Sequence, residues 1–489
     1  MITNAQGLFP VLEFDEKDGW DALLALVKPE LDRRGLERLQ PLLAADCKCV
    51  VVERHYIDRD YRDTFSHFHS KRFSTPSARC VRLHFFSTPV SESQIASEDK
   101  GTVSTYLGYS IIRPTKPNCI GRTMLAHRVR SEKTAHISQC EEDVHILGAK
   151  LHVEGFPFIS QDADATVCAQ SALWMLLRYY SNRYAWYSEI LPFQITNLAT
   201  QHAAGNRVYP SAGLFSWQLA EALRLQRFSP VVYSRKQYKD NFDHLLYTYI
   251  ESGLPLLVTV PEHVIVAYGH VSDYTRTAPL PQPAFTYSSH FNRGFVINDD
   301  NYFPFQVLNQ NGPKELRDSK FDWEKIEEFI VPLPEKVFLT AEQAQTVIEI
   351  ILRNSVVGID ALAPLLKGKN LLLRLFLTSS KSFKRRLRER GMGSPIVEEV
   401  YRRLPMPHFI WVCEIADYAE YANQRKVVGE VLWDATRNGH EPDGWIALHY
   451  PDKLLVDVGA AFNRPQELKA FDLGPSNSYS LFRSNLHSL

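Results

Sequence analysis

The most informative residue in this chain is Cys168, which stands where a polar segment gives way to an apolar helical pattern. Leu176 and Tyr180 recur at the spacing of one helix face, so the pattern predicts a helix that begins at the cysteine. Asp164 or Thr166 is a candidate cap for that helix. Free amide groups and the positive end of the helix dipole would then surround the sulfur and favour the thiolate. The position predicts a nucleophile.

Catalysis by a thiol also needs a histidine that shares its proton, a group that orients the histidine and a donor to the oxyanion. His263 begins a predicted strand, and His270 on the same strand is its competitor. The odd offset between them predicts opposite faces, so only one can face the thiol. Asp299 or Asp300 closes the next predicted strand, and the same alternation predicts that only one of them points inward. Gln161, shortly before the cysteine, is the candidate oxyanion donor.

Three stretches, QDADATVC, GLPLLVTVPEHVIVAYGHV and FVINDD, together resemble the papain-like cysteine peptidases. Within that superfamily they are most similar to the bacteriocin leader-peptidase branch, called C39-like, between residues 155 and 310. The resemblance implies that Cys168 is the nucleophile and His263 the general base and acid. It implies that Asp299 orients the imidazole and that Gln161 donates to the oxyanion. It also implies a core with a helical half and an antiparallel β half, and chemistry without a metal or an organic cofactor.

The function expected from these residues is hydrolysis of a peptide or isopeptide bond in a peptide or protein substrate, through a thioester on the cysteine. Two alternatives stay open. Acyl transfer to an amine or thiol would use the same intermediate. A non-catalytic scaffold protein with a degenerate papain-like core is the other alternative, because Val167 and Ala169 flank the cysteine where the C39-like branch usually has Cys-Gly.

Composition narrows the class of protein. Of 489 residues, 55 are basic and 56 acidic, so no overall charge favours nucleic acid or an anionic membrane as a partner. The N-terminal segment lacks a basic region followed by an apolar core, and no segment is predicted to cross a membrane. Seven scattered cysteines do not suggest a disulfide framework. We therefore expect a cytoplasmic protein with reduced thiols.

Four other features invite a functional interpretation, but simpler explanations suffice for them. Cys47 and Cys49 form a CxC pair without the further ligands of a zinc site. His67 and His69 alternate along a predicted strand, which is more often structural than metal-binding. The basic run at 381–390 is expected to be a charged helix face, because no aromatic residues alternate with its charges to favour nucleic acid. Asp434, at the end of a predicted strand, is expected to lie in a turn or an inter-domain contact.

The predicted fold class is α+β. Residues 1–150 are expected to form a helical and β-rich domain, 151–334 the papain-like domain, 335–475 a mixed helical and β region, and 476–489 a flexible tail. The expected helices lie at 20–27, 31–43, 168–180, 211–228, 241–252 and 340–354, with further helical segments continuing past residue 399. Strands are expected between residues 49 and 151, at 255–261, 263–271 and 294–300, and in the last fifth of the chain.

Overall fold

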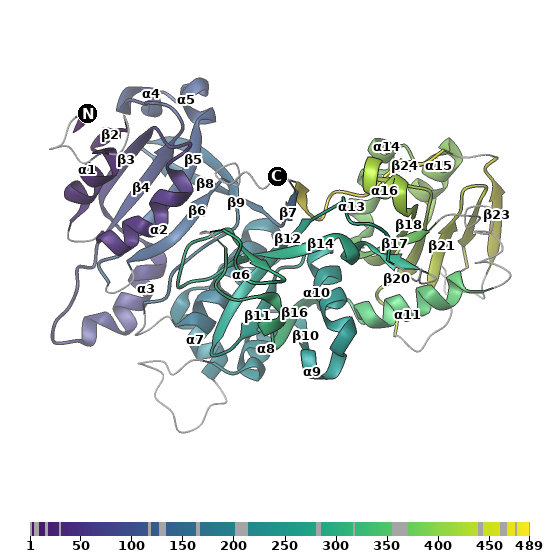
Figure 1. Ribbon diagram of the computed structural model, residues 1–489. Coiled ribbons are helices and arrows are strands. Elements are labelled where there is room, and N and C mark those ends of the chain that lie inside the picture. Colours follow the sequence, from purple (N-terminus) through teal and green to yellow (C-terminus); the bar gives the residue numbers. More distant parts are fainter. Residues whose placement is uncertain are drawn as a thin grey trace.

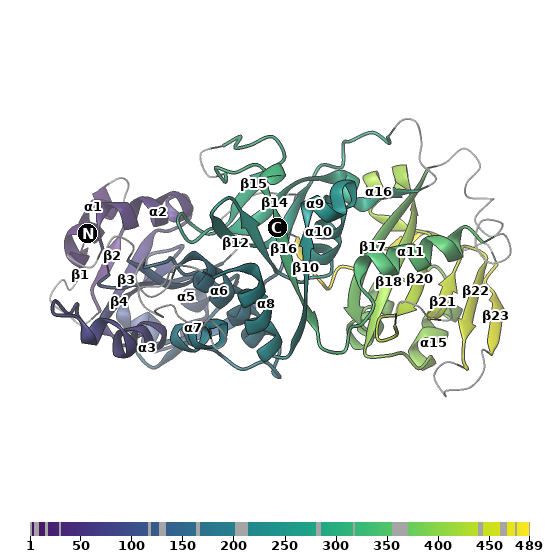
Figure 2. The same ribbon diagram turned by 90° about the horizontal axis from the view of Figure 1, so that it is seen from below.

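The computed structural model contains three units side by side, each built around its own sheet (Figure 1). Figure 2 shows the same row from below, with the N-terminal unit at one end and the C-terminal unit at the other. The structure describes all residues except 1, 4–8, 15–17, 29–30, 116–118, 127–133, 163–166, 201–213, 280–284, 316–317, 355–369, 439–443, 460–466, 475–476 and 489.

The N-terminal unit has a six-stranded antiparallel sheet in which the strands follow one another in chain order. Its strands are β1 (Ile2–Thr3), β2 (Val11–Glu13), β3 (Cys49–Tyr56), β4 (Cys80–Phe86), β5 (Tyr106–Ile112) and β6 (Ile120–Leu125), and a separate hairpin joins β8 (Cys140–Ile146) to β9 (Ala149–Gly155). Its helices are α1 (Asp18–Val27), α2 (Arg33–Leu43), α3 (Arg59–His67), α4 (Glu92–Ala96) and α5 (Lys100–Ser104), with a 3-10 turn, η1 (His69–Lys71). β4 and β5 are buried along their whole length, and the two polar side chains of β4 are paired, Arg82 with Glu53 and His84 with Tyr106.

The central unit packs helices against an eight-stranded sheet whose main path is β10-β16-β11-β12-β14-β15. These strands are β10 (Phe228–Ser234), β11 (Leu256–Val260), β12 (His263–Ser272), β14 (Asn292–Asn298), β15 (Gln306–Asn309) and β16 (Glu328–Pro334). The helices are α6 (Cys168–Arg183), α7 (Pro192–Thr200), α8 (Ser216–Leu225), α9 (Arg235–Tyr238) and α10 (Phe242–Glu251), with 3-10 turns η3 (Lys239–Asn241), η4 (Ser288–Phe291) and η5 (Trp323–Lys325). α6 is buried from Ala169 to Tyr180 and packs against β12, as expected of a helix that is apolar on most sides.

The C-terminal unit is a seven-stranded sheet with helices packed on it. Its strands are β13 (Thr286–Tyr287), β17 (Leu371–Ser379), β18 (Phe409–Asp417), β20 (Gly429–Asp434), β21 (Trp445–His449), β22 (Lys453–Asp457) and β23 (Leu468–Asp472), and a second small sheet pairs β19 (Lys426–Val427) with β24 (Tyr479–Ser480). The helices are α11 (Ala341–Leu352), α13 (Ser380–Arg385), α14 (Leu387–Arg390), α15 (Pro395–Arg403) and α16 (Tyr418–Gln424). Thr340 precedes α11, and its amide donates to the Gln343 side chain, as the capping-box pattern predicts.

The chain passes back and forth between these units. The short strand β7 (Ala135–Ile137) pairs with β12 in the central sheet, and β25 (His487–Ser488) returns from the far end of the chain to pair with β7. β13, in contrast, leaves the central unit and pairs in parallel with β17. Residues 476–489 were expected to form a flexible tail, and in the structure this segment contributes β24 and β25.

A chain of buried charges joins the central unit to the C-terminal unit. Arg374 on β17 donates to Glu251 on α10 at 2.6 Å and to Glu414 on β18 at 2.7 Å. Arg390 on α14 donates to Glu414 at 2.8 Å and to Glu430 on β20 at 2.6 Å. All five side chains are buried. Because water does not reach these side chains, each charge is stabilised by the oppositely charged groups beside it and not by solvent.

The sequence predicted the α+β class correctly, and antiparallel pairing predominates in the main sheet of each unit. Two local predictions are wrong. His67 and His69 do not alternate on a strand, because Asp58 caps α3, which ends at His67, and His69 lies in η1. The helical region expected after residue 340 is interrupted by β17, whose Arg374 is neutralised by the glutamates described above.

The seven cysteines, all of which the structure describes, are free thiols, as expected. Cys47 and Cys49 are buried in the N-terminal core, where the Cys47 thiol donates to the backbone oxygen of Cys49 at 3.4 Å. Within the described part of the chain, none of the helices has the length and apolar content needed to cross a bilayer.

Candidate active site

The ends of two neighbouring strands create the candidate site. β12 and β14 are antiparallel partners, with Val266 opposite Asn298. The start of β12 and the end of β14 therefore lie at the same end of the sheet. His263 is the first residue of β12, and Asp299 and Asp300 directly follow β14. The strand pattern gave these residues as candidates, and the family resemblance implied that His263 and Asp299 meet.

Cys168 is brought to the same place by α6, of which it is the first residue. The preceding residue, Val167, supplies no side-chain hydrogen bond to the helix end, and the amide of Ser171 is the first to bond back, to the oxygen of Val167 at 2.9 Å. The candidate caps Asp164 and Thr166 lie outside the described residues. Cys168 is partly exposed, whereas the six other cysteines are buried. It is thus the one thiol of the chain that a dissolved reagent can readily reach.

His263 connects the thiol to the carboxylates. Its Nε2 lies 2.8 Å from Asp299 Oδ1 and 3.4 Å from Asp300 Oδ1. Burial lowers the pKa of His263, but hydrogen bonds with the side chains of Asp299 and Cys168, together with the negative charge of both aspartates, outweigh it and raise the pKa to about 10. At neutral pH the ring is therefore an imidazolium held between the thiol and the carboxylates.

The expectation that only one aspartate points inward is wrong. Both carboxylates approach His263 because β14 ends at Asn298, and the strand alternation no longer applies in the turn that follows. The amide of Tyr302 donates to the backbone oxygen of Asp299 at 3.0 Å within this turn. Burial raises the pKa of Asp300 to about 7, and the nearby negative charge of Asp299 adds to that effect. Asp299 is the closer partner of the imidazole.

Gln161 reaches the site through a residue that the sequence did not single out. Its Nε2 donates to Oδ1 of Asn301. Asn301 in turn donates its backbone amide to Asp299 Oδ1 at 2.9 Å and places Nδ2 3.4 Å from Nε2 of His263. An amide nitrogen carries two hydrogens, so Gln161 keeps one for a substrate oxygen. Asn301 was visible in the sequence only as part of a polar turn.

The N-terminal unit contributes to the site from α2 and from the segment before α6. The positive charge of Arg38, a buried residue of α2, acts on both aspartates and partly opposes the rise in the pKa of Asp300 that burial causes. Arg113, at the end of β5, donates to the backbone oxygen of Ser160 at 2.8 Å and so holds the residue next to Gln161. Local pattern in the sequence gives no signal for Arg38, because it lies far from the other residues along the chain.

His270 belongs to a different environment. Its Nε2 lies 2.6 Å from Glu251 of α10, and the ring is buried. This agrees with the structural role expected for it. Asp434, the other acid noted in the sequence, accepts from the amide of Thr436 at 2.8 Å in a turn that follows β20.

Two groups of side chains in the described residues have the donor types and spacing to hold a metal ion. One is His263 with Asp299 and Asp300, and the other is the exposed set of Glu141, His152 and Glu154 on the β8–β9 hairpin. A histidine must be deprotonated to bind a metal. The raised pKa of His263 means that a metal ion would have to displace a proton from its ring at neutral pH.

The pKa of His263 gives a direct test of this arrangement. We expect the wild-type ring to titrate near pH 10 and the ring in Asp299→Asn to titrate several units lower, because the largest favourable interaction is lost while burial is kept. Histidine NMR resonances over a pH range measure both values, with His263→Gln to assign the signal.

The same shift predicts how stability depends on pH. Because the pKa of His263 is higher in the folded than in the unfolded state, the protonated ring stabilises the fold fully below pH 6.5. This contribution is lost as the pH rises through about 10. The stability difference between wild type and Asp299→Asn should therefore shrink over that interval. The surface variant Asp240→Asn is the control, and an unchanged His263 titration in Asp299→Asn would contradict the arrangement.

Comparison of the chain with models of protein families, with curated proteins and with solved structures found no match.

Proposed function

We propose that this protein is a papain-like cysteine peptidase or amidase that cleaves a peptide or isopeptide bond through Cys168, His263 and Asp299. The proposal rests on one observation above all. The imidazole of His263 is hydrogen-bonded to Asp299 at 2.8 Å, and its interactions with Asp299 and with the Cys168 side chain raise its pKa to about 10. A cationic imidazole next to an accessible sulfur is the partner that a reactive thiolate needs.

Acylation would begin with attack of the Cys168 thiolate on the carbonyl carbon of the scissile bond. His263 would give its proton to the departing amine as the carbon–nitrogen bond breaks, which leaves a thioester and a neutral imidazole. Since Nε2 faces Asp299, the other ring nitrogen is the one available to the sulfur and the leaving group. Asp299 would keep the ring in this orientation and stabilise its positive charge.

Deacylation would reverse the direction of the proton. The neutral His263 would take a proton from water as the water oxygen attacks the thioester, and the carbon–sulfur bond would then break to release the acid and restore the thiolate. The oxyanion would accept hydrogen bonds from the backbone amides in the first turn of α6 and from the second hydrogen of Gln161 Nε2.

The surroundings support the same interpretation. A helix that carries the thiol at its first residue and packs on an antiparallel sheet that carries the histidine is the layout of a papain-like core. The seven free thiols fit a reducing compartment, so a cytoplasmic location belongs to the proposal. The substrate class is a peptide or protein.

The experiment that tests the proposal is covalent labelling with a peptide that bears an electrophilic carbonyl group. Peptide mapping by mass spectrometry should place the label on Cys168, and His263→Ala should abolish labelling while circular dichroism stays unchanged. Labelling of His263→Ala at the wild-type rate, or of another cysteine instead of Cys168, would overturn the assignment. Once a cleaved peptide is found, added amines that appear in the product would indicate acyl transfer and not hydrolysis.

A further inference from the structure

A cavity of about 630 Å³ lies between the three units, away from Cys168. Its walls come from the end of α6, the β8–β9 hairpin, α13 of the C-terminal unit and the last residues of the chain. Tyr180 and Arg183 of α6 line it, whereas Cys168 begins the same helix. At 1.5 Å per residue the cavity is about 20 Å along the helix from the thiol. It is therefore a separate site.

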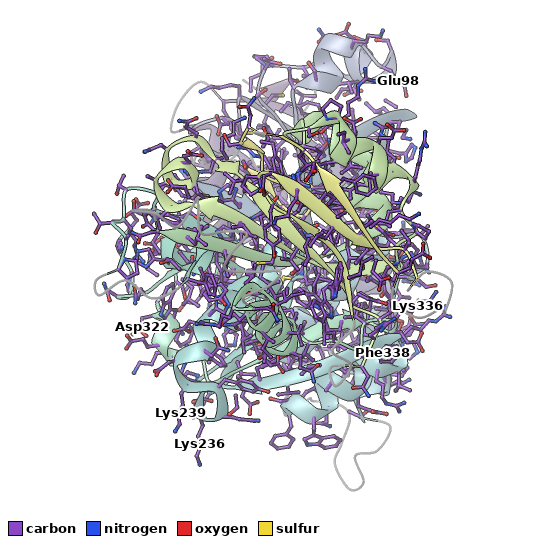
Figure 3. The ribbon with its side chains drawn as sticks, turned by 90° about the vertical axis from the view of Figure 1, so that its right-hand side faces the viewer. Glu98, Lys236, Lys239, Asp322, Lys336 and Phe338 are labelled. Carbon is purple, nitrogen blue, oxygen red and sulfur yellow. The ribbon has the colours of Figure 1, made fainter. Side chains whose placement is uncertain are left out.

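One wall of the cavity is aromatic. Trp186 is 56% exposed, and its ring stacks on Tyr184 with a centroid distance of 5.5 Å and an interplanar angle of 17°. His408 of the C-terminal unit meets Trp186 edge-on at 6.3 Å. A second hollow of about 270 Å³ continues past these rings toward Lys336, which lies at the periphery in Figure 3. An exposed indole held flat by a neighbouring ring offers a surface on which a planar ring can stack.

A second wall is cationic, and it comes from the basic run at 381–390. Three of the six cations of that run are engaged elsewhere: Arg390 belongs to the buried charge chain, Lys384 donates to the backbone oxygen of Leu404 at 2.6 Å, and Arg386 pairs with Glu389. Lys381 and Arg385 are exposed, line the cavity and lie four residues apart on α13, so they share a face of the helix. Neither has an ion-pair partner among the residues that the structure describes. An anion is the ligand that they suit.

Two buried polar atoms of residues that line the cavity lack hydrogen-bond partners within the described structure. They are the hydroxyl of Tyr180, which is 2% exposed, and Oε1 of Gln139, which is 5% exposed. Buried polar groups are nearly always paired, so these two atoms mark a wall of the cavity whose own hydrogen bonding is incomplete.

The cavity also contains carboxylates, which distinguishes it from a simple anion site. Glu141 and Glu154 on the β8–β9 hairpin line it, and Glu154 accepts from Gln139 Nε2 at 2.9 Å. Carboxylates repel a bare polyanion but accept hydrogen bonds from sugar hydroxyls. We propose that the cavity binds a nucleotide, with its planar base on Trp186, its phosphate at Lys381 and Arg385, and its ribose hydroxyls toward the glutamates. This site does not depend on the chemistry proposed for Cys168.

Calorimetric titration of the full chain with adenosine and guanosine mono-, di- and triphosphates tests the proposal, with quenching of tryptophan fluorescence as a second readout. We expect at least one nucleotide to bind, and its affinity to fall about tenfold or more in Arg385→Glu and in Trp186→Ala, since each loses a charged or stacking contact. Arg388→Glu makes the same charge change in the same basic run outside the cavity, and it should bind like wild type.

Three outcomes would overturn the proposal: no heat or quenching with any nucleotide at millimolar concentration, equal loss in Arg385→Glu and Arg388→Glu, or inorganic phosphate binding as tightly as the nucleotides. Melting temperatures of the variants, measured without ligand, separate loss of the site from loss of the fold. Labelling of Cys168 is a separate measurement, so failure of one proposal leaves the other open to test.

Discussion

Replacing Cys168 with alanine is expected to lower the rate of peptide or amide hydrolysis by about ten-thousandfold or more, because the covalent route disappears and only substrate binding and oxyanion donors remain. The change removes one sulfur atom from a partly exposed position at the start of α6, so the fold should persist. Initial rates on a fluorogenic peptide library, followed by the melting temperature of each variant, measure both effects.

Cys413→Ala is the matched control for this substitution. Cys413 lies on β18 in the C-terminal unit, where burial raises the pKa of its thiol and keeps it unreactive. The control should hydrolyse the same peptides at close to the wild-type rate. Equal activity in Cys168→Ala and wild type would exclude the thiol mechanism, and equal loss in both variants would indicate unfolding.

The second large effect is on stability and concerns the buried charge chain. Arg374→Met should lower the free energy of unfolding by about 3–5 kcal/mol, because Glu251 loses its guanidinium partner and Glu414 loses one of two while both stay buried. Chemical unfolding followed by circular dichroism measures the loss. Limited proteolysis should also cut the variant faster between the central and C-terminal units, since Arg374 joins an element of each.

The control for Arg374→Met is Arg402→Met on α15. Arg402 pairs with Glu398 four residues earlier on the exposed side of the helix, with 53% of the arginine side chain accessible. An exposed pair of this kind contributes about 0–1 kcal/mol, so the control should unfold almost like wild type. Similar losses of unfolding free energy in the two variants would contradict the prediction that the buried ion pairs contribute more to stability than the exposed pair.

The parts of the candidate site that could be predicted are those that follow from periodicity within one element. A helix that begins at Cys168 and a strand that begins at His263 are both visible as apolar patterns with a defined first residue, and the structure has both boundaries at those residues. The order of the strands then brings Asp299 close to His263. The element boundaries needed only local sequence, whereas the pairing of His263 with Asp299 was expected from the family resemblance.

The parts that could not be predicted depend on turns and on contacts between units. Alternation along a strand could not place Asp300, because β14 ends two residues before it. The charge of Arg38 acts on the aspartates from α2 of another unit, an influence that depends on how the units pack. The strand β17 was missed for a related reason: an apolar run interrupted by an arginine does not look like a buried strand until Glu251 and Glu414 are seen beside it.

The pairing of β25 with β7 has a consequence for how the protein is made. Ser488 lies opposite His136, 352 positions earlier in the chain, and their side chains are 3.0 Å apart. At a synthesis rate of about 5–20 residues per second, β7 leaves the ribosome roughly 20–70 s before its partner strand, so β7 keeps one unpaired edge until residues 487–488 appear. Ribosome-bound chains that stop short of β25 should therefore leave one edge of β7 unpaired.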